Sequence, residues 1–410
     1  MLVPVARVPR PYLVVLALAA SFVAACSQTP EKDATPDYGR ALPDGQSALV
    51  KVTDPLRIPD FRVAYGMSDD LLHAIDGSIE YLEKPSSRNA FPMANITHER
   101  AHASLRRFRD VVANAVSPDD LHGSIVRDFD VYTAYGYDGR GSVLVTGYCT
   151  PIYDASLVRT EQFRYPLYRL PPEIVKADDG TPLGMRAPDG SLAPAPTRRE
   201  IEEGSLFAAR DLELAWLADP VDAYVVHVQG SARLRLPDGS LRYVGYAGKT
   251  DRPYSSLGRA LVAEGKITKA DISLPAIRSW LAEHPEQVFQ WLWRNESYVF
   301  FTEYPEGMPH GSLGFPVTPN RSIATDKSIF PRAAPVFLSV EVPASYGTLD
   351  ATRKFRQFVL DQDTGGAIKA AGRADLYMGV GDDAERVAGR QKHVGRMYYL
   401  FLKEGAMPGR

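Results

Sequence analysis

Near the C-terminus, residues 361–381 place acidic side chains among closely spaced glycines, and this stretch constrains the fold more than any other part of the chain. An apolar segment at 355–360 precedes it, and 375–377 has the pattern of another short strand. Glycines between strands occupy positions where the backbone turns tightly or approaches a neighbour closely. The stretch therefore predicts short strands joined by tight turns, with carboxylates held on those turns as a candidate site.

The rest of the C-terminal third has the same character. Short apolar segments alternate with proline and glycine turns, at 315–317, 322–326, 336–342, 355–360 and 397–402. Short strands that turns connect closely are typical of a small β-barrel. The glycines do not precede a helix at the spacing of a phosphate-binding loop, so nucleotide binding is not predicted.

Residues 1–25 are predicted to be a lipoprotein signal peptide. Arg7 and Arg10 precede an apolar segment at 12–23, and small residues lead up to Cys26. A plain secretory signal or a short transmembrane helix is the alternative, but the apolar segment is shorter than the about 20 residues that a membrane span requires. The polar, proline-containing residues 26–47 that follow predict a flexible tether.

Composition excludes several kinds of function. The chain of 410 residues has 47 basic and 50 acidic side chains, and its net charge of −3 offers no basic surface for nucleic acid. Cys26 and Cys149 are the only cysteines, so lipidation of the first would leave no partner for a disulfide. His98 and His102 have a spacing that could hold a metal, but the arginines that follow favour a solvated helix face. Neither a metal nor a cofactor is predicted.

Helical periodicity dominates the region after the tether. Residues 69–82 and 97–116 carry apolar side chains on one face, which predicts two core helices. Strand character follows at 132–148 and ends in a predicted turn at 147–151 that is dense in hydroxyl groups. Aromatic and hydroxyl groups suit the faces and edges of sugar rings, although an aromatic near a turn is more often part of a core.

The central region mixes strands and helices. Residues 223–228 are predicted to be a strand, and a β-hairpin is predicted around the turn Pro-Asp-Gly at 237–239. Helices are predicted at 197–206, 256–264, 275–284 and 285–294. A strand at 298–301 is followed by a predicted domain boundary near residue 306.

Several of these segments resemble a known family. DTGGAIK at 363–369, followed by RADLY at 373–377, resembles the 3D domain, which is named for three aspartates, and Asp326 matches the first of them. Over roughly residues 60–403 the chain resembles the membrane-bound lytic murein transglycosylase A family through four further blocks, TGYCTP at 146–151, VQGS at 228–231, YAGK at 246–249 and NESYVFF at 295–301. Cys149 departs from the family, which usually has a second tyrosine there, and the link between the two last aspartates is longer than in some members.

The resemblance implies a mainly β fold with some α, in which a double-psi β-barrel domain and an inserted β-rich domain flank a cleft. The barrel domain is expected to be discontinuous, with residues 48–155 and 306–405, and residues 156–305 are expected to form the inserted MltA-specific domain. Acylated Cys26 would anchor the chain at the periplasmic face of the outer membrane, since Ser27 is not the aspartate that retains lipoproteins in the inner membrane. Expected partners are peptidoglycan glycan strands, outer-membrane lipid and cell-wall synthesis proteins.

The resemblance also implies the activity of a peptidoglycan lytic exotransglycosylase. Such an enzyme cleaves the β-1,4 bond between N-acetylmuramic acid and N-acetylglucosamine and forms 1,6-anhydromuramoyl ends, with one carboxylate as acid and then base. Asp375 is assigned this role, with a pKa raised by burial or by Asp363. Support is expected from Asp363, Asp326 and Lys369. The expected substrate-binding residues are Tyr148, Thr150, Gln229, Gly230, Ser231 and Tyr246.

Two other functions stay open. A muramidase that uses water would need a second carboxylate, for which Asp363 is the candidate. A non-catalytic lipoprotein could bind peptidoglycan and link the outer membrane to the wall. Asp363 and Asp326 could equally be turn-capping aspartates that bind backbone N–H groups.

Overall fold

The computed structural model describes residues 36–66, 69–177, 180–208, 210–269, 271–304, 309–344 and 351–407. The predicted signal peptide, Cys26 and the boundary predicted near residue 306 lie outside these ranges. The end of the predicted tether is packed, because the rings of Tyr38 and Tyr137 meet edge to face at 4.8 Å and Leu42 contacts the core. Within the described ranges, no helix is long and apolar enough to cross a bilayer.

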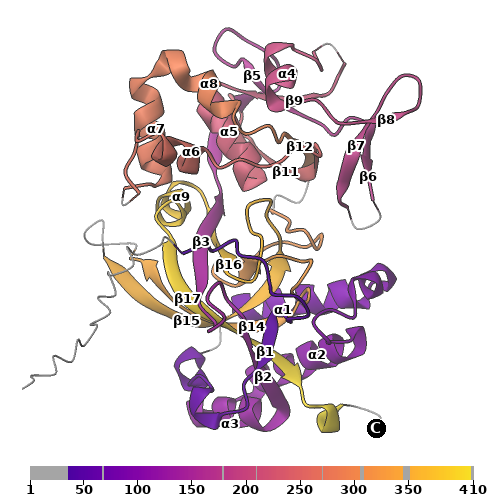
Figure 1. Cartoon of the computed structure of the whole chain (residues 1–410), viewed down its shortest axis with the longest axis vertical. Helices are drawn as coiled ribbons and strands as arrows, with labels where there is room; N and C mark the ends of the chain where they lie inside the picture. Colours follow the sequence, from indigo (N-terminus) through magenta and orange to yellow (C-terminus); the bar gives the residue numbers. More distant parts are fainter. Residues whose placement is uncertain are drawn as a thin grey trace, which may run out of the picture. The chain divides into compact units, whose positions relative to one another are not determined.

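Six strands form a closed barrel, in which each strand pairs with two neighbours (Figure 1). They are β3 (Val143–Thr150), β13 (Ser322–Ala324), β14 (Pro335–Pro343), β15 (Thr352–Asp363), β16 (Arg373–Val380) and β17 (Lys392–Leu402). The order around the barrel is β3, β16, β13, β15, β14 and β17, and β17 pairs with β3 to close it. The pairs β3–β16 and β13–β15 are parallel, and the other four are antiparallel. The barrel predicted for the C-terminal third is confirmed, and its sixth strand comes from far upstream.

Strand β17 also extends the sheet beyond the barrel. Its first residues, 392–395, pair with β3, and its last, 398–402, pair with β2 (Phe129–Ala134). Strand β1 (Leu49–Lys51) pairs with the outer edge of β2. The N-terminal and C-terminal parts of the chain therefore share one sheet.

Three helices pack against this sheet: α1 (Asp69–Glu83), α2 (His98–Asn114) and α3 (Pro118–Asp128). The first two confirm the predicted core helices, although α2 ends at Asn114 and leaves the side chain of Val116 83% exposed. Helix α3 was not predicted, even though Ser117 caps it and Pro118 occupies its first position, which is a common helix start. In Figure 1, α1 and α2 lie beside the barrel strands, and α1 contacts β15 while α2 contacts β17.

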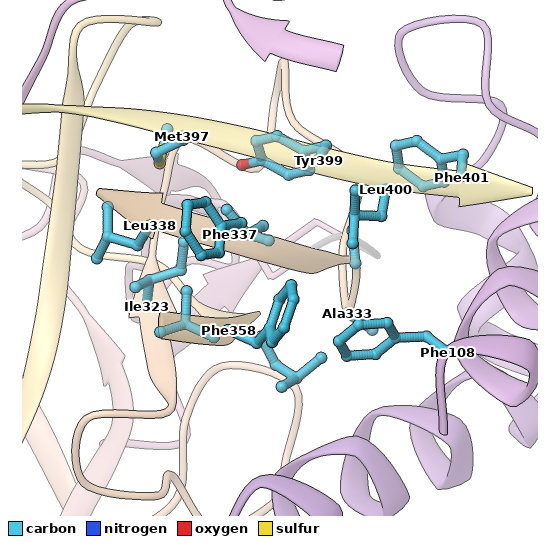
Figure 2. Close-up of a cluster of buried hydrophobic side chains, with 14 of the residues drawn as sticks. Phe108, Ile323, Ala333, Phe337, Leu338, Phe358, Met397, Tyr399, Leu400 and Phe401 are labelled. Carbon is cyan, nitrogen blue, oxygen red and sulfur yellow. The ribbon is translucent and has the colours of Figure 1, made fainter. Parts of the chain in front are cut away.

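Aromatic side chains fill the space between the helices and the barrel. The ring of Phe358 on β15 lies 5.1 Å from that of Phe108 on α2 and 5.5 Å from that of Phe337 on β14. Figure 2 shows Phe108 reaching from its helix toward the barrel strands. Both helix and strand contribute rings with at most 1% exposure, so this core fixes the helical layer on the barrel.

His98 is not on a solvated helix face, as was predicted. Its side chain is buried, and Nε2 lies 2.8 Å from the Ser87 hydroxyl and 2.9 Å from the Leu82 carbonyl oxygen. The helix turns this residue toward the last turn of α1, which offers the Leu82 carbonyl, and toward η3 (Pro85–Ala90), which offers the Ser87 hydroxyl. In the part of the chain that the structure describes, no group of three or more potential ligands could hold a metal ion.

Between β3 and the C-terminal third lies a second region with its own sheet. Its six strands, in the order β12, β11, β10, β4, β9 and β5, are β4 (Ile152–Ser156), β5 (Tyr165–Tyr168), β9 (Glu213–Leu217), β10 (Ser231–Arg235), β11 (Leu241–Lys249) and β12 (Val299–Tyr304). A three-stranded sheet comprises β6 (Ile174–Lys176), β7 (Pro182–Arg186) and β8 (Leu192–Ala193). The helices of this region are α4 (Arg198–Glu203), α5 (Pro220–Gln229), α6 (Leu257–Ala263), α7 (Leu274–Glu283) and α8 (Val288–Leu292). The predicted hairpin is confirmed as β10–β11.

Short 3-10 helices occur at several connections. They are η1 (Pro55–Arg57), η2 (Phe61–Ala64), η3 (Pro85–Ala90), η4 (Pro285–Gln287) and η5 (Glu404–Ala406). The first two begin at aspartates whose side chains accept a backbone N–H, so local capping stabilises them.

The strand predicted at 223–228 is wrong, because these residues lie in helix α5. Asp219 caps the helix, Pro220 occupies its first position, and Gly230 ends it in a left-handed conformation with φ of 78°. All residues from 223 to 227 are buried. A helix that is apolar on most sides has no helical periodicity, so its sequence could not be distinguished from that of a buried strand.

Other predicted elements also differ from the structure. Residues 147–150 continue β3 instead of forming a turn, and Ile152 begins β4 directly after Pro151. Residues 315–317 form no strand, because proline there leaves only an isolated bridge between His310 and Pro316. Helix α9 (Asp382–Ala388) was not predicted and packs against β3 and β16.

The aromatic core gives a stability prediction. We expect Phe358→Ala to lower the free energy of unfolding by about 3–5 kcal/mol, because it removes a ring that is 1% exposed and contacts two elements. Val116→Ala, at a side chain that is 83% exposed, should change it by less than about 0.5 kcal/mol. Urea unfolding followed by circular dichroism measures both, and equal effects of the two substitutions would contradict this account of the core.

Candidate active site

The parallel pairing of β3 with β16 brings the candidate residues together. Asp375 lies opposite Thr146, and Tyr377 lies opposite Tyr148. Since side chains alternate along a strand, Arg373, Asp375 and Tyr377 share one face of β16. Two segments that are more than 200 residues apart in the chain therefore contribute to one site.

Asp375 combines a buried oxygen with a raised pKa. Its Oδ1 is buried and has no hydrogen-bond partner within the described ranges. Burial raises the pKa of Asp375 to about 7, and the charge of Asp363 adds to this effect. A hydrogen bond with the Thr146 side chain and the charge of Arg373 act in the opposite direction. A carboxyl with such a pKa can donate a proton at neutral pH and accept one afterwards.

Asp363, at the end of β15, is held by three donors. The Tyr148 hydroxyl, the backbone N–H of Ser312 and the N–H of Thr364 each lie 2.8 Å from its carboxylate oxygens. Burial raises the pKa of Asp363, and these hydrogen bonds oppose that rise. Tyr148 is thus a partner of Asp363, and burial together with the nearby carboxylate raises the pKa of its hydroxyl, so it stays a donor.

Asp326 and Lys369 lie at the base of the glycine-rich loop. Asp326 accepts hydrogen bonds from the N–H and hydroxyl of Ser328, at 3.1 and 2.6 Å, and from the N–H of Ala370 at 2.9 Å. Burial would raise the pKa of Asp326, but these hydrogen bonds together outweigh it and lower the pKa. The Nζ atom of Lys369 is 3.8 Å from Asp326, and its side chain is 63% exposed. Both residues contact the loop, and no hydrogen bond described for them reaches Asp375.

The end of β3 joins the barrel to the second region. The Thr150 hydroxyl lies 3.0 Å from that of Tyr377 on β16 and 3.1 Å from that of Ser231 on β10. The N–H of Cys149 donates to Oε1 of Gln229 at 3.1 Å. Gly230, between these two partners, has the positive φ that a helix end requires.

Tyr246 is set apart from these contacts. It lies on β11, where it pairs with Phe301, and its side chain is 44% exposed. An exposed aromatic ring can stack on a sugar, but no hydrogen bond described for Tyr246 connects it to Asp375. The described hydrogen bonds therefore join Tyr148, Thr150, Gln229 and Ser231 to β3 or its neighbours, with Gly230 between two of them, and do not include Tyr246.

Sequence reasoning did not assign a role to several residues near Asp375. Thr146 and Arg373 lie beside it, within the motifs TGYCTP and RADLY respectively. Tyr254, which precedes α6, and Arg259, in its first turn, were missed. The charges of Arg259, Arg373 and Asp375 all act on the hydroxyl of Tyr254, whose pKa burial raises. No pattern in the sequence around α6 marks these two residues, since their electrostatic influence on one another and on β16 arises only in the tertiary fold.

A cavity of about 570 Å³ lies elsewhere, along α2 and α3. Its arginines are neutralised, because Arg88 pairs with Glu99 at 2.6 Å and Arg107 pairs with Asp128 at 2.7 Å. The cavity therefore does not concentrate unpaired charge, and it does not include Asp375.

The raised pKa of Asp375 gives a prediction about stability and pH. The ordinary pKa is 3.8, so any stability that the protonated carboxyl contributes is fully present below about pH 4 and is lost as the pH rises toward about 7. Asp375→Asn removes this ionisation, and we expect the variant to be more stable than the wild type at pH 8 by on the order of 2 kcal/mol. Urea unfolding at pH 4.5 and pH 8 measures the difference, which should nearly vanish at the lower pH.

Asp326→Asn is the matched control, and its expected effect has the opposite sign. The pKa of Asp326 is lowered, so its carboxylate contributes stability above about pH 4 that is lost as the pH falls. The control should therefore be less stable than the wild type at pH 8. Loss of stability at pH 8 in Asp375→Asn would mean that Asp375 is stabilised in its charged form.

Comparison with known proteins identifies two domain families in the chain. The MltA-specific insert domain matches residues 144–302, and the 3D domain matches residues 321–401. Membrane-bound lytic murein transglycosylase A of Vibrio cholerae is 34% identical over 270 residues, which cover 65% of this chain and 68% of that protein. The protein of the same name from Escherichia coli K12 is 34% identical over 279 residues, which cover 68% of this chain and 70% of that protein.

Solved structures agree with these matches. A membrane-bound lytic murein transglycosylase from Agrobacterium tumefaciens has a TM-score of 0.73 and 29% identity, covering 88% of this chain and 100% of that one. Escherichia coli MltA with bound chitohexaose has a TM-score of 0.67 and 26% identity, covering 90% of this chain and 98% of that one. From its sequence, its two domain families and its fold, this chain belongs to the membrane-bound lytic murein transglycosylase A family.

Proposed function

We propose that this protein is a peptidoglycan lytic transglycosylase that cleaves the β-1,4 bond between N-acetylmuramic acid and N-acetylglucosamine. The observation that carries the proposal is the carboxyl of Asp375, which has a buried, unpartnered oxygen and a pKa of about 7. It lies on β16, which pairs with β3, the strand that leads into the insert. Relatives that carry the same activity in their name, and one relative with bound chitohexaose, support a glycan substrate.

In the first step, protonated Asp375 donates its proton to the O4 atom of the leaving N-acetylglucosamine while the bond from C1 of the muramoyl residue breaks. In the second step, the Asp375 carboxylate removes the proton from the C6 hydroxyl of the same muramoyl residue, and O6 attacks C1. The product is a 1,6-anhydromuramoyl end, no water is consumed, and Asp375 regains its proton. Because the nucleophile belongs to the reacting sugar, its proximity replaces a second catalytic base.

The environment of Asp363 favours this reaction over hydrolysis. A muramidase that uses water needs a second carboxylate that is free to bind and activate that water. Three donors already lie 2.8 Å from the Asp363 carboxylate, two on Oδ1 and one on Oδ2, and take most of its about four acceptor positions. Asp363 therefore acts as a positioning residue, whose charge helps to keep Asp375 protonated.

The other predicted residues take supporting roles in this proposal. Asp326 and Lys369 hold the glycine-rich loop through Ala370, and the contacts of Thr150, Gln229 and Ser231 hold the insert against β3. Gly230 allows the chain to leave α5 and enter β10. Tyr246 offers an exposed ring for a sugar at some distance from the reacting bond.

The finer organisation of the chain belongs to the same proposal. The six-stranded barrel, with its two parallel pairs, is a double-psi β-barrel assembled from residues 48–155 and 306–405, and residues 156–305 are the insert. Acylated Cys26 anchors the enzyme to the outer membrane on its periplasmic face. The name "membrane-bound" carried by the relatives supports an anchor.

Product analysis tests the activity. We expect wild-type protein to release muropeptides with 1,6-anhydro ends, which are lighter by one water than reducing ends, and mass spectrometry distinguishes the two. Asp375→Asn should lower the rate about 10²- to 10⁴-fold, because a neutral amide can neither donate nor accept the proton. Reducing ends in place of anhydro ends would identify a muramidase, and equal wall solubilisation by variant and wild type would leave only a binding function.

The rate should also depend on pH in a defined direction. The first step needs protonated Asp375, so kcat/KM is expected to fall as the pH rises through about 7. Asp363→Asn removes a charge that raises the pKa of Asp375, and the descending limb should move to lower pH. The measurement is kcat/KM on solubilised glycan strands between pH 5 and 9. A descending limb at the same pH in Asp363→Asn and in the wild type would contradict this electrostatic coupling.

A further inference from the structure

Arg373 is a cation beside the catalytic candidate that lacks a full set of partners. It lies two residues before Asp375 on the same face of β16, and its Nη2 donates to the Thr146 hydroxyl at 3.4 Å. Its Nε is buried and has no hydrogen-bond partner within the described ranges. A buried guanidinium N–H without an acceptor costs free energy, which a bound acceptor would recover.

Arg259, on helix α6 of the insert, is a second cation whose charge acts on Arg373. Its helix, α6, packs through Gly258 on Ile272, and the carbonyl oxygen of Ile272 accepts a hydrogen bond from Lys392 on β17 at 3.0 Å. The side chain of Arg259 is exposed. Burial is the main cause that lowers the pKa of Arg373, and the charge of Arg259 lowers it further. Tyr254 lies within the influence of both arginines and of Asp375.

The ion pairing of these two arginines differs from that of Arg278 on α7. In the part of the chain that the structure describes, neither Arg259 nor Arg373 forms an ion pair with a carboxylate. By contrast, Arg278 nearby on α7 pairs with Asp222 at 2.6 Å and with Glu385 at 3.3 Å. Two like charges repel, so an anion that binds between them is attracted by both.

Lys249 is a further cation near the glycine-rich loop. Lys249 is the last residue of β11, and no ion pair is described for it. Its Nζ would lie 4.0 Å from a Cβ atom added to Gly366. Burial and the charge of Lys369 both lower its pKa. Lys249, Lys369, Arg259 and Arg373 thus accompany the acidic groups Asp326, Asp363 and Asp375 around the glycine-rich loop and β16.

We propose that Arg259 and Arg373 bind a carboxylate carried by the muramic acid residue whose glycosidic bond is cleaved. The proposal rests on the proposed function and specifies its substrate. The two sugars of peptidoglycan share their acetamido group and C6 hydroxyl, and they differ in the lactyl ether on muramic acid. A planar guanidinium binds a carboxylate through two N–H groups, so a pair of arginines can recognise the arm that only one sugar carries.

The carboxylate can come from two sources. In glycan strands without peptides the lactyl carboxyl itself is free, whereas in intact peptidoglycan it is bonded to the stem peptide, which carries carboxylates of its own. Chitohexaose has neither, because all its residues are N-acetylglucosamine. Comparison of the three ligands therefore separates recognition of the arm from recognition of the sugar rings.

The test uses the full chain and the substitution Arg259→Gln. We expect kcat/KM for anhydro-end formation on muramic acid strands to fall about tenfold, the usual effect of losing one charge-assisted hydrogen bond. The Kd for chitohexaose, measured by calorimetry with Asp375→Asn as background, should change less than twofold. Arg259→Lys should restore part of the rate, and Arg186→Gln, at an arginine of β7 in another sheet, is the matched control.

The outcomes distinguish the proposals. A larger loss on peptide-free strands identifies the lactyl carboxylate as the ligand, and a larger loss on intact peptidoglycan identifies a stem-peptide carboxylate. An unchanged rate on both strands, or an equal loss of chitohexaose affinity, would overturn the assignment to Arg259 and Arg373. Wild-type protein that forms no anhydro ends would instead overturn the proposed function, since the arginine test requires an active wild type.

Discussion

The parallel pairing of β3 with β16 is the interaction on which both the barrel and the candidate site depend. Closure requires a strand from before the insert to lie beside strands from after it, so the barrel cannot form until the whole central region has been accommodated. The same pairing aligns Asp375 with Thr146 and Tyr377 with Tyr148. A slip of one residue would reverse which side chains share a face, so the register of this one pair fixes the site.

The chain enters the insert at the end of the same strand, and hydrogen bonds on both sides secure this passage. The Thr150 hydroxyl contacts Tyr377 of the barrel and Ser231 of the insert. Nearby, Arg278 of α7 and Tyr153 of β4 both contact Glu385 on α9, at 3.3 and 3.2 Å. Because a small helix of the barrel and two elements of the insert share these polar contacts, the insert is attached to the strands that carry Asp375.

Local chemistry predicted much of this structure. The turn at 237–239 and the apolar face of α1 fixed their elements, and the 3D motif located Asp375 and Asp363. Where the sequence was ambiguous, tertiary contacts decided: α5 is apolar on most sides, and His98 is buried because Ser87 and Leu82 offer hydrogen-bonding groups. The influence of Arg259 on Arg373, and of both arginines on Tyr254, could not be predicted, since nothing near these residues in the chain indicates it.

The electrostatics of Asp375 and Arg373 connect the acid with the ligand-binding proposal. An arginine in a direct ion pair would hold the pKa of Asp375 well below neutrality and remove its ability to donate a proton. Arg373 instead donates to Thr146, and its charge only moderates the rise that burial causes. Because Arg373 forms no direct ion pair with Asp375, its guanidinium keeps N–H groups available for an external carboxylate. For the same reason, Asp375 can still be protonated near neutral pH. A carboxylate bound there would offset the charge of Arg373 and raise the pKa of Asp375 further, so a substrate that carries this group would itself promote the protonated form that begins the reaction.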